Sequence, residues 1–197
     1  MNTYEIEKTH SGTSLTPLAT TCFDKGILFV DGNITEETAT NFIQNGIILM
    51  SKNIPITVVI NTNGGDLQAG LNIYDFLTSM KNVTTVAVKA YSMGAVLFVA
   101  GTKRVMLPHS QLMIHEPLIS SGVSGSCSSV EAMSDVLKAK REQMAQLFAK
   151  HTGRPAKDFH KIMSKDTYFN AEEAIALNLC DEVSTWDTIL KTEVTYE

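Results

Sequence analysis

Three side chains far apart in the chain could together cleave an acyl bond: Ser92, His115 and Asp166. Ser92 lies between an apolar, β-branched run over 83–88 and an apolar, helix-like run over 93–100. Such a strand-to-helix turn lifts a hydroxyl out of the fold, and the helix N-terminus points N–H groups at a developing oxyanion. Serine is also a routine helix N-cap, which is the commoner role for one serine taken alone. The presence of a histidine and a carboxylate elsewhere in the chain favours the interpretation of Ser92 as a nucleophile.

The roles of the three residues follow from their chemistry. His115 would take the proton of the serine hydroxyl and return it to the leaving amine, and Asp166 would hold the imidazole in the right tautomer. The backbone N–H groups of Gly64 and Met93 would bind the oxyanion. Each residue also has a structural alternative. A histidine beside a strand is more often structural, an aspartate suits a turn, and a Gly-Gly pair suits a tight turn.

The elements around these residues predict how they could meet. Strand-like runs alternate with amphipathic helix-like segments, which predicts an α/β fold with mainly parallel strands. Functional groups gather at the carboxyl ends of such strands. Polar features follow three of the expected strands: Gly64-Gly65 after 56–60, Ser92 after 83–88, and His115 after 111–114.

The other segments can be assigned by periodicity and by start and stop signals. Residues 1 to about 25 lack clear periodicity, which predicts a flexible N-terminal arm, and Ser128 to Glu131 forms a capping-box pattern that would begin a long helix. We treat His151 and His160 as surface residues on helical segments. The remaining expectations are strands at 26–30, 104–107 and 182–183, a turn at 31–33, a mobile loop at 119–128, and helices at 35–52, 67–80, 128–151, 155–163 and 170–179.

Composition narrows the class of protein. With 44% apolar and 19% charged residues, the 197-residue chain is expected to form one globular domain over 1–197. A net charge of −5 without a basic cluster argues against nucleic acid as a partner. No signal peptide and no membrane span are expected, because the longest apolar run is 95–100. The three cysteines form no zinc pattern, so reduced thiols, a cytoplasmic protein and no metal site are expected.

Several ordered motifs at matching spacing make the chain from about residue 56 to 183 resemble the ClpP family of self-compartmentalised serine peptidases. They are Ile60-Asn61-Thr62-Asn63-Gly64-Gly65, Ser92-Met93-Gly94-Ala95, Leu107-Pro108-His109-Ser110, Met113-Ile114-His115-Glu116-Pro117, Lys150-His151-Thr152-Gly153, and Asp166 with Ala171-Glu172-Glu173-Ala174.

The resemblance implies a ClpP/crotonase-like spiral of βα units, with a handle loop and helix at about 117–151. It implies the triad Ser92, His115 and Asp166, oxyanion donors at Gly64 and Met93, and a substrate strand held beside Gly65 and Pro117. It also implies a homo-oligomer of two stacked heptameric rings, a tetradecamer. Unfolded polypeptides would be delivered to it by a Clp-type AAA+ unfoldase, and the chemistry would need no cofactor.

Departures from the family pattern leave alternatives open. Thr62-Asn63 replaces the usual Ser-Pro, Tyr91 replaces a small residue, and Thr167 follows the acid where arginine is common. A catalytically weak or regulatory subunit, working in a mixed ring with an active paralogue, is therefore the alternative. An acyl-CoA enzyme of the crotonase type fits less well because such enzymes usually rely on carboxylates. A Ser/Lys peptidase is weaker still, since Lys89 is the only lysine close to Ser92 in sequence.

Overall fold

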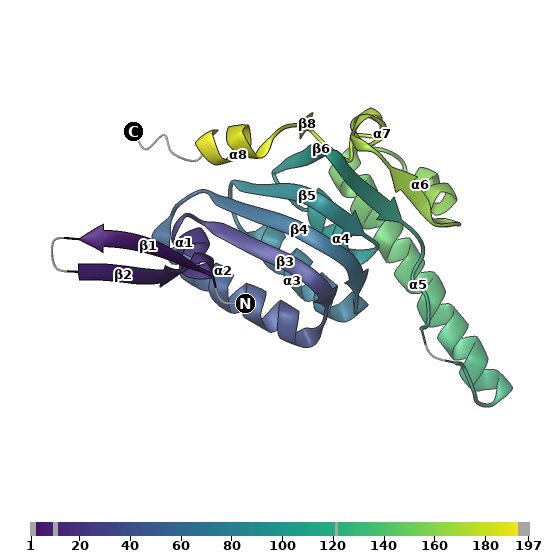
Figure 1. Ribbon diagram of the computed structural model, residues 1–197. Helices are drawn as coiled ribbons and strands as arrows, with labels where there is room; N and C mark the ends of the chain where they lie inside the picture. Colours follow the sequence, from purple (N-terminus) through teal and green to yellow (C-terminus); the bar gives the residue numbers. More distant parts are fainter. Residues whose placement is uncertain (1–2, 10–11, 121, 193–197) are drawn as a thin grey trace.

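The computed structural model describes residues 3–9, 12–120 and 122–192, and its elements alternate between strands and helices (Figure 1). The strands are β1 (Tyr4–Thr9), β2 (Gly12–Pro17), β3 (Ile27–Ile34), β4 (Ile56–Gly65), β5 (Val83–Tyr91), β6 (Lys103–Ile114), β7 (Thr167–Phe169) and β8 (Glu182–Val183). The helices are α1 (Leu18–Asp24), α2 (Glu36–Lys52), α3 (Leu67–Ser79), α4 (Met93–Val99), α5 (Cys127–Thr152), α6 (Ala156–Met163), α7 (Ala171–Ala176) and α8 (Trp186–Thr192).

The central sheet is mixed but mainly parallel, as predicted. Its strands run in the order β3-β4-β5-β6-β7, and β8 pairs with β6. The pairs β3–β4, β4–β5, β5–β6 and β6–β8 are parallel, whereas β7 is antiparallel to β6. Parallel neighbours need a crossover, and the helices α2, α3 and α4 supply it between successive strands. The carboxyl ends of β4, β5 and β6 therefore share one edge of the sheet.

The main core lies between the sheet and the helices α2 to α7. Its members include Phe98 and Phe148, which are fully buried. Alternate residues of a strand face opposite sides. On the other face of the sheet, the paired residues Val86 of β5 and Val105 of β6 form a second, small cluster with Ile189 of α8. This second face is only partly covered, since Phe29 on β3 is exposed.

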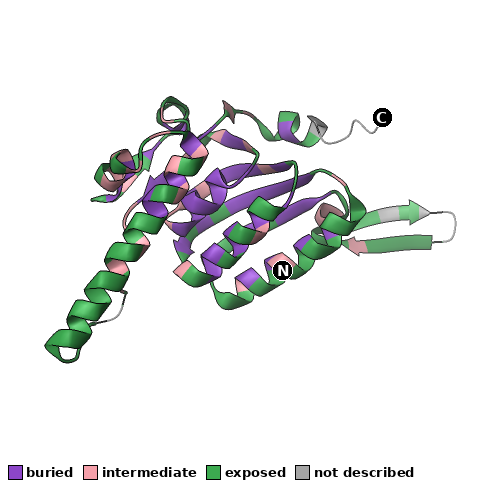
Figure 2. Cartoon of the chain, turned by 180° about the vertical axis from the view of Figure 1, so that it is seen from behind, coloured by how far each residue is buried: buried purple, intermediate pink, exposed green. Residues whose placement is uncertain are grey.

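Helix α5 projects from the body of the molecule (Figure 1). Its buried residues all belong to the C-terminal third, and its N-terminal half is exposed (Figure 2). The N-cap lies two residues before the expected one: it is Ser126, whose hydroxyl accepts a hydrogen bond from Ser129 N–H, so Ser128 lies inside the helix. It ends at Gly153, whose φ of 71° provides the left-handed cap that the sequence predicts.

Several local expectations are wrong. The segment up to about residue 25, expected to be a flexible arm without regular elements, contains the hairpin β1–β2 and helix α1. The turn expected at 31–33 is an irregularity inside β3, and the two strands expected around Pro108 are one strand, β6, with a register shift in its pairing to β5. The final helix of the expected set ends at Ala176, and α8 has no counterpart among the expected elements.

Candidate active site

Ser92 occupies a sharp turn between β5 and α4. Its φ of 54° and ψ of −119° lie outside the ordinary regions for a residue with a side chain. Such strain persists only where the surroundings fix it. Here the N–H of Ser92 donates to the carbonyl of Met113 at 2.8 Å, which ties the turn to β6. The strained turn presents the hydroxyl at the end of the sheet, as a nucleophile elbow does.

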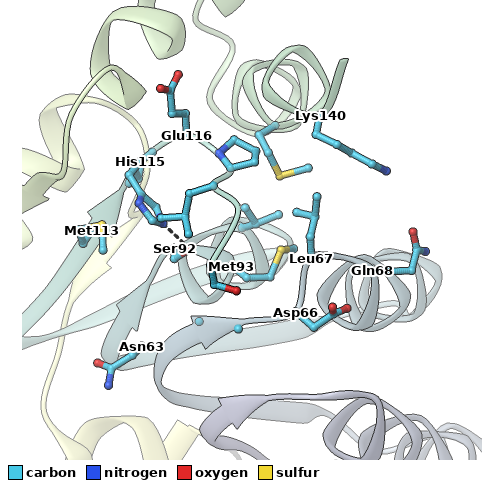
Figure 3. Close-up of a pocket in the computed structure, with 18 of the residues that line it drawn as sticks. Asn63, Asp66, Leu67, Gln68, Ser92, Met93, Met113, His115, Glu116 and Lys140 are labelled. Atoms are coloured by element: carbon cyan, nitrogen blue, oxygen red, sulfur yellow. Dashed lines mark hydrogen bonds between the residues drawn. The ribbon is translucent and has the colours of Figure 1, made fainter. Parts of the chain in front are cut away.

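His115 follows β6 directly and reaches the serine. Its Nε2 lies 2.7 Å from Ser92 Oγ (Figure 3). The next residue anchors the loop, because the N–H of Glu116 donates to the carbonyl of Met163 at 3.0 Å. The imidazole side chain is mostly buried, with 17% of its surface exposed. A base within hydrogen-bonding distance of a hydroxyl has the geometry needed to accept its proton.

Asp166 comes beside His115 through strand pairing. The antiparallel register of β6 and β7 pairs Ile114 with Thr167. His115, which follows Ile114, therefore lies beside Asp166, which precedes Thr167. Asp166 Oδ1 lies 3.3 Å from His115 Nδ1, and its side chain is 60% exposed. The structure therefore brings together the three residues singled out in the sequence, with a short serine–histidine contact and a longer, solvated histidine–aspartate contact.

Gly64 and Gly65 are the last two residues of β4, which replaces the expected turn, and they lie against the serine. A Cβ atom on Gly64 would lie 2.7 Å from Ser92 Cβ and 3.1 Å from Met93 N, so only glycine fits there. The N–H of Gly64, however, donates to Thr62 Oγ1 at 2.9 Å, and in this arrangement it is not available to an oxyanion. The N–H of Asp66 donates to the carbonyl of Ile34 on β3. Because successive N–H groups of a strand point in opposite directions, the N–H of Gly65 points away from β3.

A pocket of about 810 Å³ opens beside the serine (Figure 3). Gly64, Gly65, Met93 and Pro117, all singled out in the sequence, line it together with Ser92 and His115. Much of the remaining wall is apolar and comes from α3, α4 and α5: Leu67, Val96, Val136, Leu137, Met144 and Phe148. The space is large enough for several residues of an extended peptide and lies on the serine–histidine side of the site.

Sequence reasoning missed two features of this region. Lys140 of α5 lines the pocket. Because Lys140 lies four residues before Met144, helical spacing could have indicated that the two residues share one face of α5. Tyr91 and Tyr168 form an edge-to-face ring contact with centroids 5.6 Å apart, which joins the strand before Ser92 to the strand after Asp166. That contact depends on the pairing of distant strands, which no local pattern contains.

His151 is not the surface residue that we expected. It is half-buried, and its Nε2 lies 2.7 Å from the hydroxyl of Tyr74 on α3. Burial, with a smaller effect from the charges of Lys150 and Arg104, lowers the pKa of His151 from 6.5 to about 4. It is therefore neutral near pH 7, and the Tyr74 O–H can donate to it. His160, also partly buried, pairs with Glu142 at 2.7 Å.

Arg104 anchors the C-terminal segment near His151. Its buried guanidinium pairs with Asp181 and donates to the carbonyls of His151 and Asn178. These contacts fix the end of α5 against the sheet. They lie outside the candidate active site.

Within the described residues, no helix is both long and apolar enough to span a bilayer. The same part of the chain contains no group of three or more His, Cys, Asp or Glu side chains that could hold a metal ion.

Comparison with known proteins gives a consistent result. A family model described as Clp protease matches residues 11–187. Over 165 residues, the chain is 34% identical to ATP-dependent Clp protease proteolytic subunit 2 of Thermobifida fusca (strain YX), covering 81% of this chain and 80% of that one.

Proposed function

The chain belongs to the Clp protease family and is a serine peptidase with the α/β fold of that family; from this premise we propose that Ser92, His115 and Asp166 are its catalytic triad and that its substrates are unfolded polypeptides. The observation that carries the proposal is the 2.7 Å contact between Ser92 Oγ and His115 Nε2 at a strained strand-to-helix turn.

In the proposed reaction, His115 Nε2 takes the proton of Ser92 as the hydroxyl oxygen attacks the peptide carbonyl. The imidazolium then gives this proton to the leaving amine, and a water repeats the sequence to release the acid. Asp166, beside Nδ1, stabilises the positive ring during both steps. Because its carboxylate is largely exposed and 3.3 Å away, water screens part of this stabilisation.

We assign the oxyanion site to backbone amides on both sides of the serine. Met93 begins α4, and the N–H groups of the first helical turn have no partner within their own helix. The second donor in our proposal is Gly65 in place of Gly64, because Gly64 N–H already binds Thr62 Oγ1. A substrate strand would lie between the Gly65 segment and the loop at Pro117, adding its backbone hydrogen bonds to both.

The proposed assembly is a homo-oligomer of two stacked heptameric rings, fed by a Clp-type AAA+ unfoldase. The name of the Thermobifida relative, a proteolytic subunit of an ATP-dependent protease, supports such a partner. The exposed apolar side chains Val130, Met133 and Val136 on the projecting part of α5 support association through this helix. The cytoplasm is the proposed compartment.

A catalytically weak subunit that works in a mixed ring with an active paralogue is the second candidate. The long, solvent-exposed contact between His115 and Asp166 favours it, because a loosely held carboxylate orients the imidazole poorly. In that arrangement, contacts from a neighbouring subunit would complete the triad. Native mass and activity of the protein alone, and then with a paralogue, separate the two candidates.

The experiment that tests the triad is labelling of the purified protein with a fluorophosphonate probe, with native mass measured in parallel. We expect the probe to modify wild type and the Ser79→Ala variant, which lacks a surface serine whose hydroxyl binds the carbonyl of Phe76. Ser92→Ala should not be modified, and its peptide hydrolysis should fall by about three orders of magnitude or more. Equal labelling of Ser92→Ala and wild type would refute the assignment.

A further inference from the structure

Lys140 is the only lysine or arginine among the described residues that line the pocket beside Ser92. It lies four residues before Met144, whose side chain is buried, so the two share one face of α5. The close-up shows Lys140 and His115 on opposite sides of the pocket, with the apolar side chains of Leu67 and Met93 on the wall below them (Figure 3). The pocket thus has a catalytic end, an apolar middle and a cationic end.

The charge of Lys140 is not matched by a carboxylate in the part of the chain that the structure describes. Its Nζ donates a hydrogen bond to Gln143 Oε1 at 3.3 Å, and no ion pair within 4.0 Å joins it. Its neighbours on the same helix are paired: Lys138 contacts Asp135 at 3.0 Å, and Arg141 contacts Glu116 at 3.5 Å. Lys140 is therefore the one of these three basic residues on α5 that has no carboxylate partner among the described residues.

The two carboxylates of the pocket wall are engaged elsewhere. Glu116 is the partner of Arg141. Asp66 is the N-cap of α3, and its Oδ1 accepts the N–H of Ala69 at 2.7 Å, where the positive end of the helix dipole stabilises its charge. Neither forms an ion pair with Lys140, although their two negative charges outnumber its single positive charge in the pocket wall.

From this arrangement we infer that Lys140 determines specificity: it makes the enzyme favour peptides with glutamate at P1, the residue whose carbonyl Ser92 attacks. The inference rests on the proposed function of Ser92. A P1 side chain leaves the chain one bond from the attacked carbonyl, so it enters the pocket beside Met93. The methylenes of glutamate would lie on the apolar middle, and its carboxylate would meet the ammonium group of Lys140 in a partly desolvated site, where charge pairing is stronger than in water.

The test compares hydrolysis of three fluorogenic peptides, acetyl-Ala-Leu-X-aminomethylcoumarin with X as Glu, Gln or Leu, by the assembled full-length protein. Gln matches Glu in shape, so the ratio of their kcat/KM values isolates the charge. We expect wild type to favour Glu over Gln about tenfold at low salt, and less at high salt. Lys140→Met should bring the ratio near one, and Lys140→Glu should favour Gln. Lys138→Met, which removes a lysine outside the pocket, should keep the wild-type ratio.

The outcomes separate this inference from the proposed function. If Leu peptides are hydrolysed and Ser92 is labelled, but the Glu-to-Gln ratio is the same in wild type and Lys140→Met, the specificity inference is wrong and the triad stands. If no peptide is hydrolysed and the fluorophosphonate probe leaves Ser92 unmodified, both are overturned. A ratio that changes in Lys138→Met as much as in Lys140→Met would show a general effect of surface charge and would also overturn the inference.

Discussion

At the scale of single residues, the closest constraint on the nucleophile is the absence of a side chain at Gly64. A Cβ there would lie 2.7 Å from Ser92 Cβ and 3.0 Å from the carbonyl oxygen of Tyr91, and the φ of +98° is unfavourable for any other residue. We predict that Gly64→Ala displaces Ser92 and lowers kcat/KM about a hundredfold or more, because a displacement near 1 Å has effects of that order. Peptide hydrolysis by the purified variant measures this loss of kcat/KM.

The matched control is Gly153→Ala. Gly153 has a φ of +71°, but a Cβ there would meet nothing within 4 Å. This variant carries the backbone strain, worth about 1 kcal/mol of stability, without the contact at the active site. It should keep wild-type kcat/KM. Comparable activity losses in the two variants would mean that backbone strain, and not the contact with Ser92, controls the site.

The sequence predicted which residues meet at the candidate site better than it predicted the state of their hydrogen-bonding groups. Ser92 and His115 could be found because residue type and strand-end placement are local properties. The amide of Gly64 could not be judged from sequence, since its use depends on the rotamer of Thr62. The exposure of Asp166 likewise depends on how much of the carboxylate the neighbouring elements cover.

At the scale of elements, Ser92 follows β5 and Asp166 precedes β7, so these two strands hold two members of the proposed triad, and one aromatic contact joins the strands. Tyr91 precedes Ser92, and Tyr168 follows Asp166 by two residues. Their rings meet edge to face with centroids 5.6 Å apart, and the Tyr91 hydroxyl donates to Gln111 at 2.5 Å. We therefore expect Tyr91 to act as a positioning residue, which affects the chemistry through the strands that it connects.

We predict that Tyr91→Ala lowers kcat about tenfold with a smaller change in KM, because it loosens the placement of Asp166 and leaves the pocket wall intact. Tyr91→Phe keeps the ring contact and should recover most of the activity. Tyr168→Ala should resemble Tyr91→Ala, and the double variant should lose less than the product of the two single losses. Steady-state kinetics on one fluorogenic peptide suffices. Wild-type kcat in Tyr91→Ala would exclude a positioning role.

Element prediction succeeded where apolar periodicity is strong and failed where pairing partners are distant. Helix α2 and its Thr35 cap are confirmed, since the Thr35 hydroxyl accepts the N–H of Thr38. The inward face expected for this helix is only partly right, because Phe42 is buried whereas Ile47 and Met50 are exposed. Nearly all of the described side chains of the hairpin β1–β2 are exposed. The hairpin therefore has no buried face that an alternating apolar pattern could have revealed. Among the side chains of α8 whose burial the structure describes, Ile189 alone belongs to a buried cluster, so the apolar pattern is too short to recognise.

At the scale of the whole molecule, the body and the projecting helix have different sources of stability. The body encloses a continuous apolar core, whereas the N-terminal half of α5 has no buried side chain and remains exposed (Figure 2). An isolated, solvent-exposed helical segment gains little from its own hydrogen bonds, since most helix stability in proteins comes from packing. The C-terminal third of α5, fixed by Phe148, His151 and Arg104, therefore supports the rest of the helix.

This anchorage makes the stability of the protein depend on pH. The pKa of His151 is about 4 in the folded protein, chiefly because of burial, and near 6.5 in the unfolded chain. Between these values the unfolded chain binds the proton and the folded one does not, so the contribution of His151 is complete above pH 6.5 and is lost as the pH falls toward 4. Because the side chain is only half-buried, we expect the loss to be on the order of 1–2 kcal/mol.

Urea unfolding at pH 7.5 and pH 5.0 measures this loss. We predict that His151→Gln, which keeps an acceptor for the Tyr74 hydroxyl, reduces the difference in unfolding free energy between the two pH values. His109→Gln removes an exposed histidine and should behave as wild type. The shift of Asp181, whose pKa the Arg104 guanidinium lowers against the effect of burial, acts below about pH 4 and does not enter this window. An unchanged pH difference in His151→Gln would mean that other groups control the acid sensitivity of the fold.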